Sequence, residues 1–245
     1  MSYYNGDHSL IIGEKNTWTD WHLIPAKRPS VSMPQIRTKF IEIPGAFGTL
    51  DLTELLTGCP VYGDRTGSWE FIMDPDREDM TSWANLYQTI AMYVHGRRRR
   101  VVFTDDPEYY YEGRLAVAGL EPEDGYTTLT INYELDPYKL PVHDPFDTGW
   151  LWDPFDFETG VIPQGKSTTI SGTTTITLYR QSEDYSPAFK CSSAMTLEYE
   201  GRTYSLISGV NYLHEIIIQA DDPSAHSFKF TGNGTVQISE MGARL

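Results

Sequence analysis

The sequence predicts a mainly β protein with an N-terminal β-rich domain that contains one α-helix and a C-terminal antiparallel β-sandwich. Three observations support this prediction. The 245 residues are enough for two domains of on the order of 100 to 150 residues each. The 20 glycines and 15 prolines are typical of a globular chain with many turns. Only one segment has an apolar pattern of helical period.

The N-terminal part, to about residue 74, is interrupted by prolines. Frequent prolines exclude long helices and favour short edge strands. One such strand is predicted at residues 38–43. The prolines are Pro25, Pro29, Pro34, Pro44 and Pro60.

The predicted helix is marked by one apolar stripe whose members are three or four residues apart along the chain. Acidic residues near Asp74 or Asp79 mark its start, where they favour the positive end of the helix dipole. Gly96 marks its end, because glycine best adopts the left-handed conformation of a C-terminal cap. The stripe consists of Trp83, Leu86, Tyr87, Ile90, Ala91 and Val94.

A run of three strands is expected directly after this helix. The first contains the four consecutive arginines 97–100 and continues through residues 101–103. Residues 104–107 form a turn, and residues 109–118 return as the second strand of a hairpin. The third strand follows Asp124-Gly125, since residues 129–134 alternate between apolar and polar side chains.

The domain boundary is placed after residue 141, where the composition changes. Residues 142–158 contain five acids, two copies of Asp-Pro-Phe-Asp and no Lys or Arg. We therefore expect an N-terminal domain at 1–141, an acidic aromatic connection at 142–165, and a β-sandwich at 166–245 whose first strand can begin within 142–165. Its strands are predicted at 174–180, 195–199, 203–206, 215–219, 227–230 and 235–239, with turns at Gly201, Gly209 and Gly232 to Gly234.

Composition limits the functional classes. The formal net charge of -15 argues against a surface that embraces a phosphate backbone. Cys59 and Cys191 have no His or Cys at metal spacing, so reduced structural thiols are expected, with a disulfide as the second alternative. No apolar run approaches the roughly 20 residues needed to cross a bilayer, and residues 1–5 lack signal-peptide features. We expect synthesis in a cytoplasm and no membrane insertion.

The search for catalytic motifs predicts no enzyme, no cofactor and no metal site. Phosphate-binding loops, dinucleotide fingerprints, paired-His zinc helices and nucleophile-elbow serines are missing from the sequence. Residues 147–149 look like half of an aspartic-protease site, without a second copy. The acids of 144–158 suit a glycosidase carboxylate pair or a calcium ion, but no spacing supports either. A packed connection between domains is the simpler interpretation.

Five ordered motifs in the N-terminal half resemble one known family. They are NTWTDWHLIP at 16–25, IPGAFGTLDLT at 43–53, HG at 95–96, DDPEYYYEGR at 105–114 and DPYK at 136–139. Over residues 10–140 the chain resembles the distal tail protein family of long-tailed, siphovirus-type bacteriophages and prophages. The resemblance implies a protruding β-hairpin in the N-terminal domain and a galectin-like C-terminal β-sandwich without an implied sugar site.

The same resemblance implies a structural virion protein. Members form a hexameric ring at the tail tip that connects the tail tube to the host-adsorption apparatus. The implied partners are further copies of the chain, the tail tube protein, a tail-associated tip protein, and receptor-binding or baseplate proteins. The implied location is the virion tail tip, after synthesis in the host bacterial cytoplasm.

The arginine run is then expected at a ring interface or on a channel face, together with Asp105 and Asp106. In a strand, Arg97 and Arg99 face one way and Arg98 and Arg100 the other. One pair is expected to neutralise acids within the subunit or across the interface, and the other to lie on a solvated or channel face. Such charges fix register more than they add affinity. Specific nucleic-acid binding is not expected.

Two alternatives from other classes stay open. The first is a carbohydrate-binding module for host cell-wall sugar, in which Trp150, Trp152 or Tyr212 stacks on a sugar ring. It requires exposed rings beside a shallow groove. The second is a tail-associated hydrolase, which requires convergent carboxylates with perturbed pKa values, and only residues 144–158 offer candidates.

Overall fold

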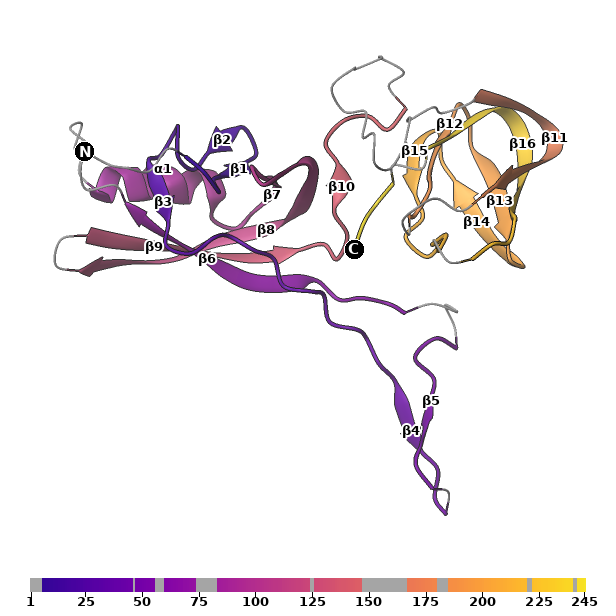
Figure 1. Ribbon diagram of the computed structural model, residues 1–245, viewed down its shortest axis with the longest axis horizontal. Helices are drawn as coiled ribbons and strands as arrows, with labels where there is room; N and C mark the ends of the chain where they lie inside the picture. Colours follow the sequence, from indigo (N-terminus) through magenta and orange to yellow (C-terminus); the bar gives the residue numbers. More distant parts are fainter. Residues whose placement is uncertain are drawn as a thin grey trace. The chain divides into compact units, whose positions relative to one another are not determined.

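The computed structural model describes residues 6–45, 47–55, 60–73, 83–123, 126–146, 167–179, 185–219, 222–239 and 242–245. The chain divides into two compact units, Met1–Val142 with Leu245, and His143–Arg244. Both are built almost entirely of antiparallel strands, and the described residues contain one helix (Figure 1). The predicted mainly β fold is therefore confirmed. In the described part of the chain, no helix has both the length and the apolar character needed to cross a membrane.

The first unit is built on an antiparallel sheet with strand order β2-β1-β7-β8-β9-β6-β3, to which β10 is added beside β8. Helix α1 packs on one face of this sheet, and its Ile90 and Val94 are fully buried. The core between them is made of apolar side chains from six strands and the helix. The elements are β1 (Leu10–Ile12), β2 (Lys15–Asn16), β3 (Leu23–Pro25), β6 (Arg65–Met73), α1 (Trp83–Val94), β7 (Arg97–Phe103), β8 (Asp106–Glu123), β9 (Tyr126–Leu135) and β10 (Leu140–Pro141).

Helix α1 ends where the sequence predicts. Gly96 has a φ of 71°, in the left-handed region that L side chains avoid, and its N–H donates to the carbonyl of Leu115 at 2.7 Å. This bond ties the end of the helix to β8 before the chain enters β7. The start that was predicted near Asp74 or Asp79 lies outside the described residues.

The three strands after the helix are confirmed, and the second is longer than expected. β8 covers Asp106–Glu123, because its partner β9 continues the ladder far beyond residue 118. β8 lies between β7 and β9, so Gly113 is opposite Arg99 on one side and opposite Leu135 on the other.

A thin arm extends from the first unit. β4 (Phe40–Glu42) and β5 (Thr49–Asp51) form a two-stranded sheet of their own, which lies away from the main sheet in Figure 1. The strand predicted at 38–43 is thus present, and it belongs to a protruding hairpin. At the base of the arm, the N–H of Arg37 donates to the carbonyl of Val61, and the N–H of Gly63 donates to the carbonyl of Gln35, both at 2.8 Å.

The second unit is a six-stranded antiparallel sheet with the order β14-β13-β16-β12-β15, and β11 also pairs with β16. β16 pairs with β13 in its first half and with β12 in its second half, so one strand serves both halves of the sheet. The ring centroids of Phe189 (β12) and Phe228 (β16) lie 5.7 Å apart, within a single apolar core. The strands are β11 (Ser167–Leu178), β12 (Ala188–Cys191), β13 (Met195–Tyr199), β14 (Arg202–Leu206), β15 (Gly209–Tyr212) and β16 (His226–Ser239).

Two predictions for this unit are wrong. Residues 232–234 were predicted as a turn, but they lie inside β16. Gly232 and Gly234 have φ values of 153° and 144°, and they lie where β16 changes partners. Residues 215–219 were predicted as a strand, but they contribute only an isolated bridge between Ile218 and Tyr185.

Cys191 is a buried, free cysteine, and burial raises the pKa of its thiol to about 11. The thiolate is the reactive form, so this side chain behaves as a small apolar core residue near neutral pH. Cys59 lies outside the described residues.

Candidate functional site

The arginine strand β7 divides its charges between two faces. Arg98 and Arg100 lie on the face opposite the helix, beside Glu112 of β8. The Nε of Arg98 lies 3.3 Å from Glu112, and its Nη2 donates to Asp136. The Nε of Arg100 lies 4.0 Å from Glu112, and its guanidinium lies over the ring of Tyr110, 4.6 Å from the centroid. This pair therefore has acidic partners within its own chain.

Arg99 lies on the helix side of the strand. Its Nε and Nη2 donate to the carbonyl of Tyr93 at 3.3 and 3.1 Å, and its guanidinium lies 4.2 Å from the centroid of that ring. A cation at the C-terminal end of a helix interacts favourably with the helix dipole. Arg99 is therefore used to hold α1 against β7.

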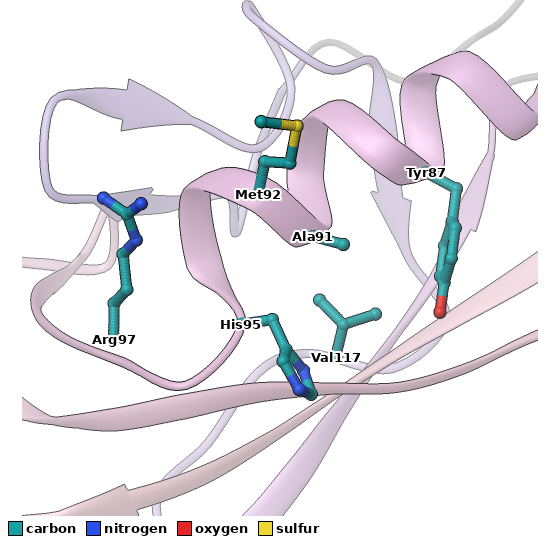
Figure 2. Close-up of a pocket in the computed structure, with 6 residues that line it drawn as sticks. All are labelled: Tyr87, Ala91, Met92, His95, Arg97 and Val117. Atoms are coloured by element: carbon teal, nitrogen blue, oxygen red, sulfur yellow. The ribbon is translucent and has the colours of Figure 1, made fainter.

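Arg97 is exposed and borders a shallow hollow of about 410 Å³ beside α1 (Figure 2). Figure 2 shows Met92 and Arg97 at the rim, and Tyr87 and His95 beside the sheet. The hollow is wide open, and it holds no cluster of acids or nucleophiles. Its lining residues are Tyr87, Ala91, Met92, His95, Arg97 and Val117.

The two predicted aspartates lie in ion pairs that tie separate segments to the β7–β8 turn. Asp105 accepts from His8 Nδ1 at 2.8 Å and from Arg28 Nε at 2.9 Å. Asp106 accepts from the ammonium of Lys139. Hydrogen bonds from His8, with a further contribution from Arg28, lower the pKa of the Asp105 carboxyl.

The Asp105 contact predicts a pH-dependent stability. The carboxylate stabilises the folded chain fully above its ordinary pKa of 3.8, and this contribution is lost as the pH falls through the lowered folded value. Asp105→Asn is expected to reduce the free energy of unfolding at pH 7 by about 1 kcal/mol or less. The difference from the native chain should disappear in acid. Urea titrations from pH 7 to pH 2 test this, with Glu121→Gln, an exposed carboxyl on β8, as the control. A difference that is constant with pH would contradict the assignment.

Sequence reasoning missed the cations that lie over three consecutive tyrosines. Lys139 lies over Tyr109, Arg100 over Tyr110 and Arg65 over Tyr111. The pattern was hidden because none of the three cations is a sequence neighbour of its ring. Each pair is a cation–π contact, and each joins β8 to a different segment.

Arg65 is a buried charge at the start of β6, with 2% of its surface exposed. Its Nε donates to the carbonyl of Pro137 at 2.7 Å, and its Nη1 donates to the carbonyl of Ser32 at 2.8 Å. Burial lowers the pKa of this guanidinium. Arg65 thereby joins the chain before the arm to the chain after β9. In the sequence, the only signal for this role was a lone arginine at the start of the strand.

The arm exposes apolar side chains along its whole length. Phe47 at the tip is fully exposed, and the strands expose apolar residues at consecutive positions, so neither face of the hairpin is covered. A two-stranded hairpin without a packed face is only marginally stable in water, and clustered exposed apolar groups mark interaction sites. The exposed apolar residues from the base to the end of the arm are Met33, Ile36, Phe40, Ile41, Ile43, Phe47, Leu50 and Leu55.

Among the described residues, none of the candidates for the two alternative functions are brought together. Trp150 and Trp152 lie outside the described residues, and Tyr212 of β15 is half-buried. Of the acids in 144–158, only Asp144 is described, and it accepts from Lys190 at 3.1 Å. Within the described ranges, no three His, Cys, Asp or Glu side chains are grouped so that they could hold a metal ion.

Comparison with known proteins gives a likeness of fold. No protein-family model matches the sequence, and the search of curated proteins found no match. Among solved structures, the Dit protein (gp 19.1) of phage SPP1 matches with a TM-score of 0.53 and 16% identity, over 97% of this chain and 99% of that chain. That protein is described as a paradigm of the hub adsorption apparatus in phages that infect Gram-positive bacteria. The insecticidal crystal protein Cry2Aa aligns with 58% of this chain and 33% of its own at a TM-score of 0.20, which is too low to carry any argument. The chain thus resembles the SPP1 protein in fold over 97% of its length.

Proposed function

We propose that the chain is a structural subunit of a phage tail tip, where copies of it form a hexameric ring that connects the tail tube to the host-adsorption apparatus. The apolar arm is the observation that carries this proposal. The likeness to the SPP1 protein over nearly the full length of both chains supports it, because the alignment covers both units of this chain.

The arm supports self-association for a physical reason. When another surface covers its exposed apolar residues, the burial stabilises the assembly by roughly 25 cal/mol per Å² of apolar area. A protruding element that docks on a different surface of the next copy makes a heterologous contact, and such contacts close into rings when the rotation between copies allows. Six copies are the number that the family resemblance implies.

The charged face of the sheet supports the same assembly in a different way. Arg98, Arg100, Glu112 and Asp136 form a compact set of opposite charges on the face away from the helix. Charges of this kind select partners and fix register in an interface. The carboxylates of Glu112 and Asp136 also partly neutralise Arg98 and Arg100. This suits a protein that does not bind nucleic acid specifically.

The proposed partners, chemistry and location follow from this place at the tail tip. The partners are the tail tube protein, a tail-associated tip protein, and receptor-binding or baseplate proteins. The chain acts without catalysis and without a cofactor, is made in the host bacterial cytoplasm, and resides in the virion tail tip.

The arm variant Phe47→Ser tests the proposal. Phe47 is fully exposed, so its loss leaves the fold of the subunit intact, whereas a buried aromatic anchor contributes on the order of 2 kcal/mol or more to an interface. We expect the concentration at which the ring dissociates to rise by more than about tenfold. Size exclusion with light scattering, over a range of protein and salt concentrations, measures this.

Ile207→Ser is the matched control for this variant. Ile207 is an exposed apolar residue of the second unit. The variant therefore loses a similar apolar group outside the arm, and it should assemble as the native chain does. Equal assembly of the native chain and Phe47→Ser would contradict the role of the arm.

A further inference from the structure

The second unit has a long edge strand. β11 pairs with β16 over its full length of 12 residues, from Ser167 opposite Gln237 to Leu178 opposite His226. The other side of β16 is occupied by β13 and β12. β11 therefore lies at the edge of the sheet, and among the described strands its outer side has no partner. An edge of this kind presents a row of backbone N–H and C=O groups.

β11 lacks the features that normally protect such an edge. Natural proteins use charged side chains, proline, short strands or bulges to prevent pairing with another chain. The strand has neither a charged residue nor a proline. Gly172, with a φ of 75°, interrupts it and leaves residues 173–178, Thr-Thr-Thr-Ile-Thr-Leu, as an uninterrupted segment. The opposite edge strand β14 has only five residues and carries Arg202.

The side chains of this segment are also incompletely covered. Ile176 and Leu178 point toward the core of the second unit but are only half-buried, whereas Phe228 and Phe230 of the neighbouring strand are fully buried. Thr173, Thr175 and Thr177 form an exposed row on the other face. A further strand at this edge would extend both rows and cover the two apolar side chains.

We infer that this segment of β11 pairs antiparallel with the same segment of a second copy, about a two-fold axis at Thr175. With that centre, Thr173 lies opposite Thr177 of the other copy and Thr174 lies opposite Ile176. Threonines thus face threonines on the outer surface, and β-branched residues meet on the inner one, which are favourable cross-strand pairs. The absence of charge in the segment removes any like-charge repulsion at the axis.

The pairing is isologous, and one partner saturates it. It uses a different unit of the chain from the arm, so it does not require the ring. A two-fold contact cannot repeat between neighbouring subunits of one six-fold ring. Where the ring of the proposed function also forms, this contact therefore joins a subunit of one ring to a subunit of a second ring.

A disulfide at the axis tests the pairing in the full-length chain. Residues directly opposite in antiparallel strands have Cα atoms about 4.5 to 5.5 Å apart, which suits a disulfide. In a Cys59→Ser background, Thr175→Cys is expected to give a covalent dimer under mild oxidation. The buried Cys191 with its raised thiol pKa does not compete. Ser227→Cys, on an exposed position of β16 one strand further in, is the matched control and should stay monomeric on a non-reducing gel.

A charge at the axis provides a second test, which the ring does not obscure. In the Phe47→Ser background, sedimentation equilibrium should detect dimers that Thr175→Lys weakens by about tenfold or more, because two lysines then face each other. Thr235→Lys adds the same charge to an exposed position of β16 and should leave the dimer unchanged. Absence of both the disulfide and the dimer, with ring formation unaffected, would overturn the inference and leave the proposed function intact.

Discussion

Gly113→Ala is expected to unfold the first unit at a much lower denaturant concentration than the native chain. A Cβ at this position would lie 2.2 Å from the carbonyl oxygen of Glu134 and 2.5 Å from the Cα of Leu135. Both atoms belong to the backbone of β9, so no side-chain rotation relieves the overlap. Separating β8 from β9 in the middle of the sheet should cost about 3 kcal/mol.

Urea unfolding followed by tryptophan fluorescence measures this effect, since Trp21 and Trp69 are buried in the core of the same unit. Gly119→Ala is the matched control. It lies in the same strand, but its Cβ would meet nothing within 4 Å, so its stability should change by less than about 0.5 kcal/mol. Equal midpoints for the two variants would show that β8 and β9 are not packed as described.

Arg65→Leu is the second substitution with a large expected effect. It removes the part-buried hydrogen bonds from the guanidinium to the carbonyls of Ser32 and Pro137, and a hydrogen bond to a charged group contributes about 1.5 to 3 kcal/mol. The variant also loses the cation over Tyr111. We expect a total loss of about 3 kcal/mol, accompanied by faster amide exchange at the base of the arm, because Arg65 holds that segment against the sheet.

Two comparisons isolate the cause. Arg65→Lys keeps the charge but not the planar fork of donors, so it should recover only part of the lost stability. Arg97→Leu removes an exposed arginine of the same unit and should change stability by less than about 0.5 kcal/mol. Unchanged exchange at the arm base in Arg65→Leu would contradict the role given to Arg65.

The elements that sequence predicted well are those with local signals. The helix was found because Ile90 and Val94 belong to an apolar stripe and Gly96 ends it. The hairpin of β7 and β8 was found because the turn residues lie between two strand-like runs. In each case the decisive residues lie within a few positions of one another, and period and turn chemistry operate over that range.

The missed features depend on partners that are distant in the chain. Arg98 pairs with Asp136, which is 38 residues away along the chain. Arg65 donates a hydrogen bond to the carbonyl of Pro137, which is 72 residues away. The glycines of β16 suggested a turn because glycine usually ends a strand, whereas here Gly232 and Gly234 let one strand change partners. Exposure of the arm also has no local signal, because Phe40, Ile41 and Leu50 look like ordinary core residues in sequence.

Electron microscopy of the purified full-length chain tests the central claim most directly, because it shows the closed assembly and its symmetry. Averages in projection are expected to show rings of six equal subunits around a central opening, and Phe47→Ser prepared in parallel should give no closed rings. Single particles of the native chain at every concentration and salt condition would contradict the claim that the chain assembles into a ring.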